Sequence, residues 1–126
     1  MIRPSAAIVG ASADRRKFGN KAVRAYLQQG WTVHPVNPRG GTVEGVEAFT
    51  RLADIPGRPH RVLLYLPPEI GITVLPEIVT AAPAELYVNP GADGPELLAE
   101  ARRLGLSPIL ACGILAIGVS PSRFPD

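Results

Sequence analysis

The chain has 126 residues, of which 46% are hydrophobic and 19% are charged, and this composition predicts one globular domain over residues 1–126. A single cysteine excludes an internal disulfide framework and a cysteine-rich zinc site. No apolar run is long enough to cross a membrane and no leader-like segment opens the chain, so we expect a cytoplasmic protein.

The net charge is only +2, but the basic side chains gather at one end of the sequence. Residues 1–40 hold seven basic groups and one acid, a net charge of +6, whereas residues 41–126 hold six basic and ten acidic groups, a net charge of −4. A basic first third predicts contact with an anionic ligand. The alternative is a solvated surface that is basic without a ligand.

Strand, turn and helix alternate from the start of the chain. Residues 6–9 are a short apolar run that predicts a strand, and residues 19–29 place apolar side chains at helical spacing. Gly30 follows at the position where a helix-ending glycine belongs. Residues 32–36 predict a second strand, which Pro35 places near a sheet edge because proline has no N–H for a strand ladder.

The middle of the chain contains the strongest strand signal. Residues 37–60 predict an irregular connection with a short helical turn near 52–54. Residues 61–66 are an almost continuous apolar run, typical of a strand buried on both faces. A helix is expected from about 72 to 82, with Pro76 near its first turn, where a missing N–H is tolerated.

The last third repeats the same alternation. Residues 85–88 and 108–111 predict strands. Between them, Asp93-Gly94-Pro95 predicts the start of a helix with the acid at or near the N-cap, and Gly105 is expected to end that helix. The predicted core face of the helix consists of Leu97, Leu98, Ala101 and Leu104.

Short apolar strands that alternate with amphipathic helices predict an α/β domain. We expect a single Rossmann-like doubly wound parallel sheet of about five strands, with helices on both faces. In such sheets, ligands bind at the carboxyl ends of the strands, near the point where the strand order reverses. The loops that follow the strands are therefore the expected functional segments.

The loop after the first strand, residues 10–19, combines small residues with a basic triplet. Small residues let the backbone approach a ligand, and the next helix offers free N–H groups and the positive end of its dipole. The pattern is neither G-x-G-x-x-G nor a Walker A loop, and the alternative is a turn that needs small residues for packing alone. The expected diphosphate contacts are Gly10, Ala11, Ser12, Ala13, Arg15, Arg16, Lys17 and Gly19.

The loop after the second strand bears on which nucleotide is bound. An NAD site usually places Asp or Glu at the end of this strand to bind the ribose diol, whereas this chain has Asn37, Pro38 and Arg39, with no carboxylate before Glu44. Arg39 suits a phosphate on the ribose, which an acid would repel. NADP carries such a phosphate at the 2′ position and coenzyme A (CoA) carries one at the 3′ position. The alternative is an exposed turn arginine.

Four motifs occur in the same order as in a known family: Gly10-Ala11-Ser12, Val36-Asn37-Pro38-Arg39, Leu52-Ala53-Asp54-Ile55-Pro56 and Tyr65-Leu66-Pro67-Pro68-Glu69. They resemble the stand-alone CoA-binding proteins, which are similar to the N-terminal domain of the succinyl-CoA synthetase α subunit and of ADP-forming acyl-CoA synthetases. The resemblance covers roughly residues 5–112.

This resemblance implies binding of coenzyme A or an acyl-CoA. The family's phosphate loop falls on Ser12 to Arg15, extended by Arg16 and Lys17, and its basic residue after the V-x-P turn falls on Arg39. The adenine and pantetheine walls of the family fall on Leu66, Pro67, Pro68, Asn89, Pro90 and Gly91.

The remaining reactive side chains predict no catalytic centre. Cys112 ends an apolar run, which favours a small buried hydrophobe, and it lacks the charged residues that often precede the cysteine of stand-alone family members. His34 and His60 have no neighbouring acids at a metal or triad spacing. We therefore expect no catalytic residues and no metal.

Three functions remain open from the sequence. The leading one is a module that binds CoA or an acyl-CoA without catalysis of its own. The others are an NADP-binding, reductase-like domain and a subunit that supplies a CoA site to a separately encoded acyl-CoA ligase. Nucleic acid is not expected as a partner, because only one end of the sheet is basic and aromatic residues are 6% of the chain. A homo-oligomer is compatible with the sequence.

Overall fold

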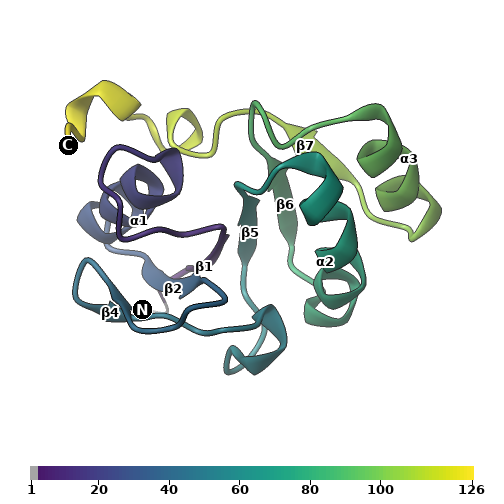
Figure 1. Ribbon diagram of the computed structural model, residues 1–126, viewed down its shortest axis with the longest axis horizontal. Helices are drawn as coiled ribbons and strands as arrows, with labels where there is room; N and C mark the ends of the chain where they lie inside the picture. Colours follow the sequence, from purple (N-terminus) through teal and green to yellow (C-terminus); the bar gives the residue numbers. More distant parts are fainter. Residues whose placement is uncertain (1–2) are drawn as a thin grey trace.

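The computed structural model describes residues 3–126 and contains a central parallel sheet between two layers of helix (Figure 1). The strands of the sheet are β1 (Ser5–Val9), β2 (Thr32–Val36), β5 (Arg61–Leu64), β6 (Glu85–Val88) and β7 (Pro108–Leu110). The helices are α1 (Phe18–Gln28), α2 (Pro68–Ala81) and α3 (Pro95–Arg103).

The order of the strands across the sheet is β2-β1-β5-β6-β7, and every neighbouring pair is parallel. This order confirms the predicted doubly wound fold, in which the chain first moves outward from β1 and then returns past it to build the other half. β2 lies at the edge of the sheet, as Pro35 predicted, and Pro35 pairs in register with Ile8.

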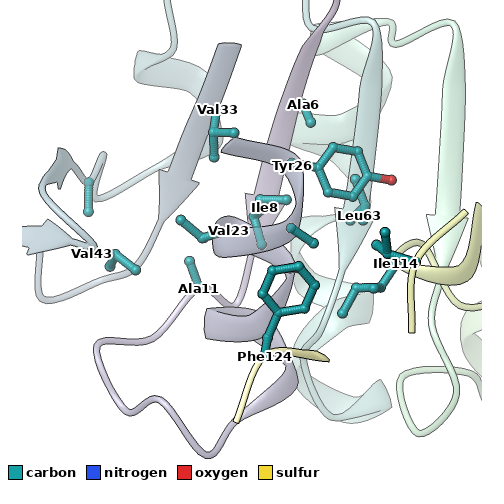
Figure 2. Packing of buried hydrophobic residues seen from close by; sticks show 14 residues of the cluster. Ala6, Ile8, Ala11, Val23, Tyr26, Val33, Val43, Leu63, Ile114 and Phe124 are labelled. Atoms are coloured by element: carbon teal, nitrogen blue, oxygen red, sulfur yellow. The ribbon is translucent and has the colours of Figure 1, made fainter. Parts of the chain in front are cut away.

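Alternate residues of β1 serve two separate cores. Ala6 and Ile8 pack with α1 and with the C-terminal segment (residues 112–126), whereas Ala7 and Val9 pack with α2 and α3. Figure 2 shows the first of these cores, in which Phe124 from the C-terminal segment lies beside α1. The sheet is therefore covered on both faces, and its central strands are buried.

The expected start of the second helix is wrong. The helix α2 begins at Pro68, not near residue 72, so that Pro76 lies inside the helix. Pro68 opens the helix because its fixed φ and missing N–H suit the first helical position. Pro76 is tolerated on the exposed side of α2, while Leu75 and Ile78 are buried. The preceding strand is correspondingly shorter than the apolar run and ends at Leu64.

A smaller expectation also needs correction. The connection 37–60 is not wholly irregular, because β3 (Thr42–Val43) and β4 (Val46–Glu47) form a short antiparallel hairpin before the confirmed 3₁₀ turn Leu52–Asp54. Asp93 lies near the N-cap of α3, as expected: the N-cap is Gly94, and the Asp93 carboxylate accepts a hydrogen bond from the backbone N–H of Gly91. Among residues 3–126, no helix is long and apolar enough to span a bilayer.

Candidate functional site

A cleft of about 1060 Å³ lies at the carboxyl ends of the strands. β1 and β5 are neighbours in the middle of the sheet, but α1 follows β1 on one face and α2 follows β5 on the other. The loops after these strands diverge, which opens the crevice expected at the reversal of strand order. The volume lies near the upper end of the range for ligand sites, so the cleft has room for a large ligand.

Four loops supply the lining of this cleft. The predicted residues that line it are Gly10, Ala11, Ser12, Ala13, Lys17, Gly19, Asn37, Pro38, Arg39, Leu66, Pro67, Pro90 and Gly91. The predicted residues that do not line it are Arg15, Arg16, Pro68 and Asn89. Residues that line it without having been predicted are Asp14, Phe18, Gly40, Thr42, Val43, Tyr65, Ile70 and Ala92.

Two glycines in the first loop are required by close approaches of the backbone. Gly10 has a φ of 96°, and a Cβ there would lie 2.7 Å from the carbonyl oxygen of Tyr65. A Cβ on Gly19 would lie 2.3 Å from the carbonyl oxygen of Gly10. A larger residue at position 19 would therefore push the start of α1 away from the end of β1, and one at position 10 would push away the segment after β5. The small residues serve packing, and they also leave the loop backbone at the cleft surface.

One backbone hydrogen bond and two asparagine side chains hold the same loop. The amide of Ala11 donates to the carbonyl of Val36 at 3.2 Å. Asn37 Nδ2 donates to the carbonyl oxygen of Ala11 at 2.8 Å, and Asn20 Nδ2 donates to that of Ser12 at 2.9 Å. No side chain caps α1, whose first residues line the cleft. The positive end of the helix dipole is thus available to an anion there.

The basic triplet of this loop is divided by ion pairs. Arg16 Nη2 lies 2.9 Å from Asp14 Oδ2, and Arg15 Nε lies 3.5 Å from Glu44 Oε2. The hydrogen bond from the Arg16 side chain lowers the pKa of Asp14 to about 2, so this carboxylate stays charged at neutral pH. Lys17 is exposed, lines the cleft and makes no ion pair with the residues that the structure describes.

Arg39 lies in the segment that follows β2, the strand next to β1 in the sheet. Its backbone N–H donates to Asn37 Oδ1 at 2.8 Å, which fixes the turn that presents the side chain. The guanidinium is exposed, and within residues 3–126 it pairs with no carboxylate. Lys17 and Arg39 are therefore two cations of the cleft lining that the described chain leaves uncommitted.

The opposite wall is largely apolar and comes from the loops after β5 and β6. Leu66, Pro67 and Pro90, which the resemblance puts in the adenine and pantetheine walls, line this side of the cleft. Asn89 has a different position: it is 1% exposed, its side chain donates to the carbonyl of Leu64 at 3.0 Å, and it accepts a hydrogen bond from the amide of Gly113 at 2.7 Å. Asn89 thus ties the β6 end to the segment after β7.

Tyr65 lines the cleft, but its hydroxyl is buried and has no hydrogen-bond partner among the described residues. Burial raises the pKa of this phenol, so it stays protonated at neutral pH.

The other reactive side chains lie outside the cleft lining. Cys112 is half-buried, less than the buried hydrophobe that the sequence favours, and it packs against the core on the α1 face. Burial lowers the pKa of His34. The part of the chain that the structure describes contains no cluster of three or more His, Cys, Asp or Glu residues able to hold a metal ion.

The fold and the cleft define the class of protein. A doubly wound parallel sheet with a cation-flanked cleft at its switch point is the arrangement of Rossmann-like nucleotide-binding domains. The chain matches the family model described as "CoA binding domain" over residues 4–117, and it belongs to that family.

Similar proteins agree with this assignment. A conserved hypothetical protein from Pyrococcus furiosus has a TM-score of 0.77 and 27% identity, and the match covers 91% of this chain and 99% of that one. The α subunit of an ADP-forming acetate–CoA ligase II from the same organism is 36% identical over 62 residues, which are 48% of this chain and 14% of the subunit.

Part of a larger synthetase shares the fold. The "dinucleotide forming acetyl-coenzyme A synthetase 1" of Ca. Korarchaeum cryptofilum has a TM-score of 0.72 and 23% identity, over 83% of this chain and 25% of that one. The chain thus spans about a seventh of the ligase subunit and a quarter of the synthetase. It is a CoA-binding domain related to a subunit of ADP-forming ligases.

Proposed function

We propose that the chain binds coenzyme A or an acyl-CoA in the cleft and carries out no catalysis of its own. The observation that carries the proposal is that Lys17 and Arg39 both line one cleft, together with the uncapped start of α1. Two cations and a helix N-terminus favour a ligand with separated phosphate groups. Membership of the CoA-binding family supports CoA as the ligand with that chemistry.

Each part of CoA has a proposed place. The diphosphate lies against the loop of residues 10–19, where backbone amides, the Ser12 hydroxyl and Lys17 are available. The ribose 3′-phosphate lies against Arg39. Pantetheine extends over the apolar wall, which is formed by Leu66, Pro67, Pro90 and Gly91.

A titration with a series of ligands tests the proposal. Calorimetry should give the tightest binding for CoA, weaker binding for dephospho-CoA and NADP, and the weakest for NAD, which carries no phosphate at a ribose 2′ or 3′ position. The positive lining and the apolar wall are the reasons for this order. Tighter binding of NADP than of CoA would replace the proposal by a dinucleotide-binding function.

A second candidate function rests on the match to one subunit of an acetate–CoA ligase. In this case the chain would supply the CoA site of a ligase whose nucleotide-binding subunit is separately encoded. The test is ADP-forming acyl-CoA synthesis with each protein alone and with the two mixed. Activity only in the mixture supports this role, and binding of CoA without any effect on the second protein favours the independent module.

A further inference from the structure

Asn20 lies beneath the first loop of the cleft and is fully buried, at 0% exposure. Its side chain hydrogen-bonds to the first loop, to the β3–β4 hairpin and to Arg24 of the same helix. Its Nδ2 donates to the carbonyl oxygen of Ser12 at 2.9 Å and to Glu44 Oε2 at 3.0 Å. Its Oδ1 accepts from Arg24 Nε at 2.8 Å. Asn20 therefore joins the loop, the β3–β4 hairpin and Arg24.

Arg24 continues this chain of contacts to residues about a hundred positions away. Its Nη1 donates to the carbonyl of Pro125 at 2.7 Å, and its Nη2 donates to the carbonyls of Phe124 and Arg15, each at 3.0 Å. Lys21 Nζ also donates to the carbonyl of Phe124, at 2.9 Å. Phe124 is 7% exposed, and its side chain lies in the core on the α1 face (Figure 2).

We propose that Phe124 and Pro125, acting through Arg24 and Asn20, hold the loop of residues 10–19 in the shape that receives the diphosphate. Arg24 and Asn20 are positioning residues in this assignment. The inference rests on the proposed function, because the diphosphate is the group that the loop is held for.

The hydrogen-bond partners of Lys21 and Arg24 support this assignment. Lys21 and Arg24 belong to the basic first third of the sequence, yet neither lines the cleft, and both donate to carbonyl oxygens of the C-terminal segment. Arg24 donates hydrogen bonds to three carbonyl groups, one in the first loop and two in the C-terminal segment, and so fixes the distance between these two segments. A loop fixed before the ligand arrives loses less conformational entropy on binding, which raises affinity.

A double-mutant cycle tests the proposal. The variants are Arg24→Met, which keeps an apolar stem, a chain that stops after Arg123, and the combination of both. Arg123→Met is the matched control, because it removes the same charge from a neighbouring exposed residue outside the network. We expect each of the first two changes to weaken CoA binding roughly 3- to 10-fold, the size of the ordering cost of a side chain or two. The combination should cost no more than the larger single change.

Three readouts separate positioning from direct contact and from general destabilisation. The losses should be equal for CoA and dephospho-CoA. The dependence of affinity on salt should stay unchanged, because no charge that meets the ligand has been removed. In the ligand-free folded protein, NMR order parameters should fall at the amides of residues 12–16 in Arg24→Met and not in Arg123→Met.

Several results would overturn the inference. They are additive losses in the cycle, a weaker salt dependence in Arg24→Met, or order parameters in the loop that stay as in the parent chain. The last measurement needs no ligand, so it decides the inference even if the parent chain fails to bind CoA. That failure would count against the proposed function alone.

Discussion

In the proposed function, recognition of the ribose 3′-phosphate depends on Arg39. Replacing it in Arg39→Ala should weaken CoA binding on the order of tenfold to a hundredfold, the worth of a hydrogen bond to a charged group. Dephospho-CoA, which lacks the 3′-phosphate, should bind nearly as it does to the parent chain. Calorimetry with both ligands measures the difference.

The control for this change is Arg102→Ala, which removes the same charge from an exposed residue of α3 outside the cleft. It should leave both affinities unchanged. An equal loss for CoA and dephospho-CoA in Arg39→Ala would show that Arg39 does not contact the 3′-phosphate. No loss for either ligand would make it an ordinary surface arginine.

Lys17 should contribute equally to the binding of CoA and of dephospho-CoA. Lys17→Ala removes the uncommitted cation at the start of α1. This is the proposed place of the diphosphate that CoA and dephospho-CoA share. We expect both affinities to fall by a similar factor and to depend less on salt, because one screened charge contact is gone. Titrations at low and moderate salt provide the measurement. A loss confined to CoA would instead place Lys17 at the 3′-phosphate.

The sequence could predict which residues are basic but not which of them stay available. Arg16 pairs with Asp14 two positions away, a short-range contact that could have been foreseen. Arg24 instead binds carbonyl groups that lie 100 and 101 positions further along the chain, and this depends on the packing of the C-terminal segment against α1. The basic first third is thus partly used within the fold, and two of its cations line the cleft.

At the scale of elements, the contact between α1 and β1 is set by Gly19. The substitution Gly19→Ala puts a Cβ 2.3 Å from a backbone oxygen, so α1 must move away from the end of β1. We expect a loss of about 1–3 kcal/mol in the free energy of unfolding, as for other overpacked contacts, together with weaker CoA binding. Denaturant unfolding and calorimetry measure the two effects.

Gly105→Ala is the matched control for stability. Gly105 has a φ of 84° and no heavy atom within 4 Å of its added Cβ, so alanine there strains the backbone at the end of α3 without touching the cleft. It should lower stability by about 1–2 kcal/mol and leave the affinity for CoA unchanged. A Gly19→Ala variant that binds CoA like the parent chain would show that the loop tolerates movement of α1.

The elements themselves were predicted unevenly, for physical reasons. All five sheet strands could be foreseen, because continuous apolar runs between Gly and Pro residues have few other uses in a domain of this size. The start of α2 was missed because Pro67 and Pro68 stop a strand and open a helix equally well. The hairpin of β3 and β4 was missed because strands of two residues leave no periodic pattern.

For the whole molecule, the topology explains why loops from different parts of the sequence share one cleft. Parallel strands bring their following loops to one edge, so Leu66, Pro67, Pro90 and Gly91, which the family resemblance named, line the same cleft as Lys17. The lining residues Thr42 and Val43 could not be assigned, because they depend on how the β3–β4 hairpin folds back toward the sheet. Asn89 was assigned to the lining from the resemblance, but the structure directs its amide into the interior.

The two faces of the sheet differ in when a growing chain can complete them. The core beside α2 and α3 draws on residues no later than Leu106, whereas the core beside α1 also needs Ile114, Val119 and Phe124. The ribosome makes a chain from its N-terminus, so the first loop and α1 are made early, whereas the C-terminal residues that complete their core are made last. During synthesis, α1 can pack against the sheet early, but the part of this core that Ile114, Val119 and Phe124 cover stays exposed until those residues have been made.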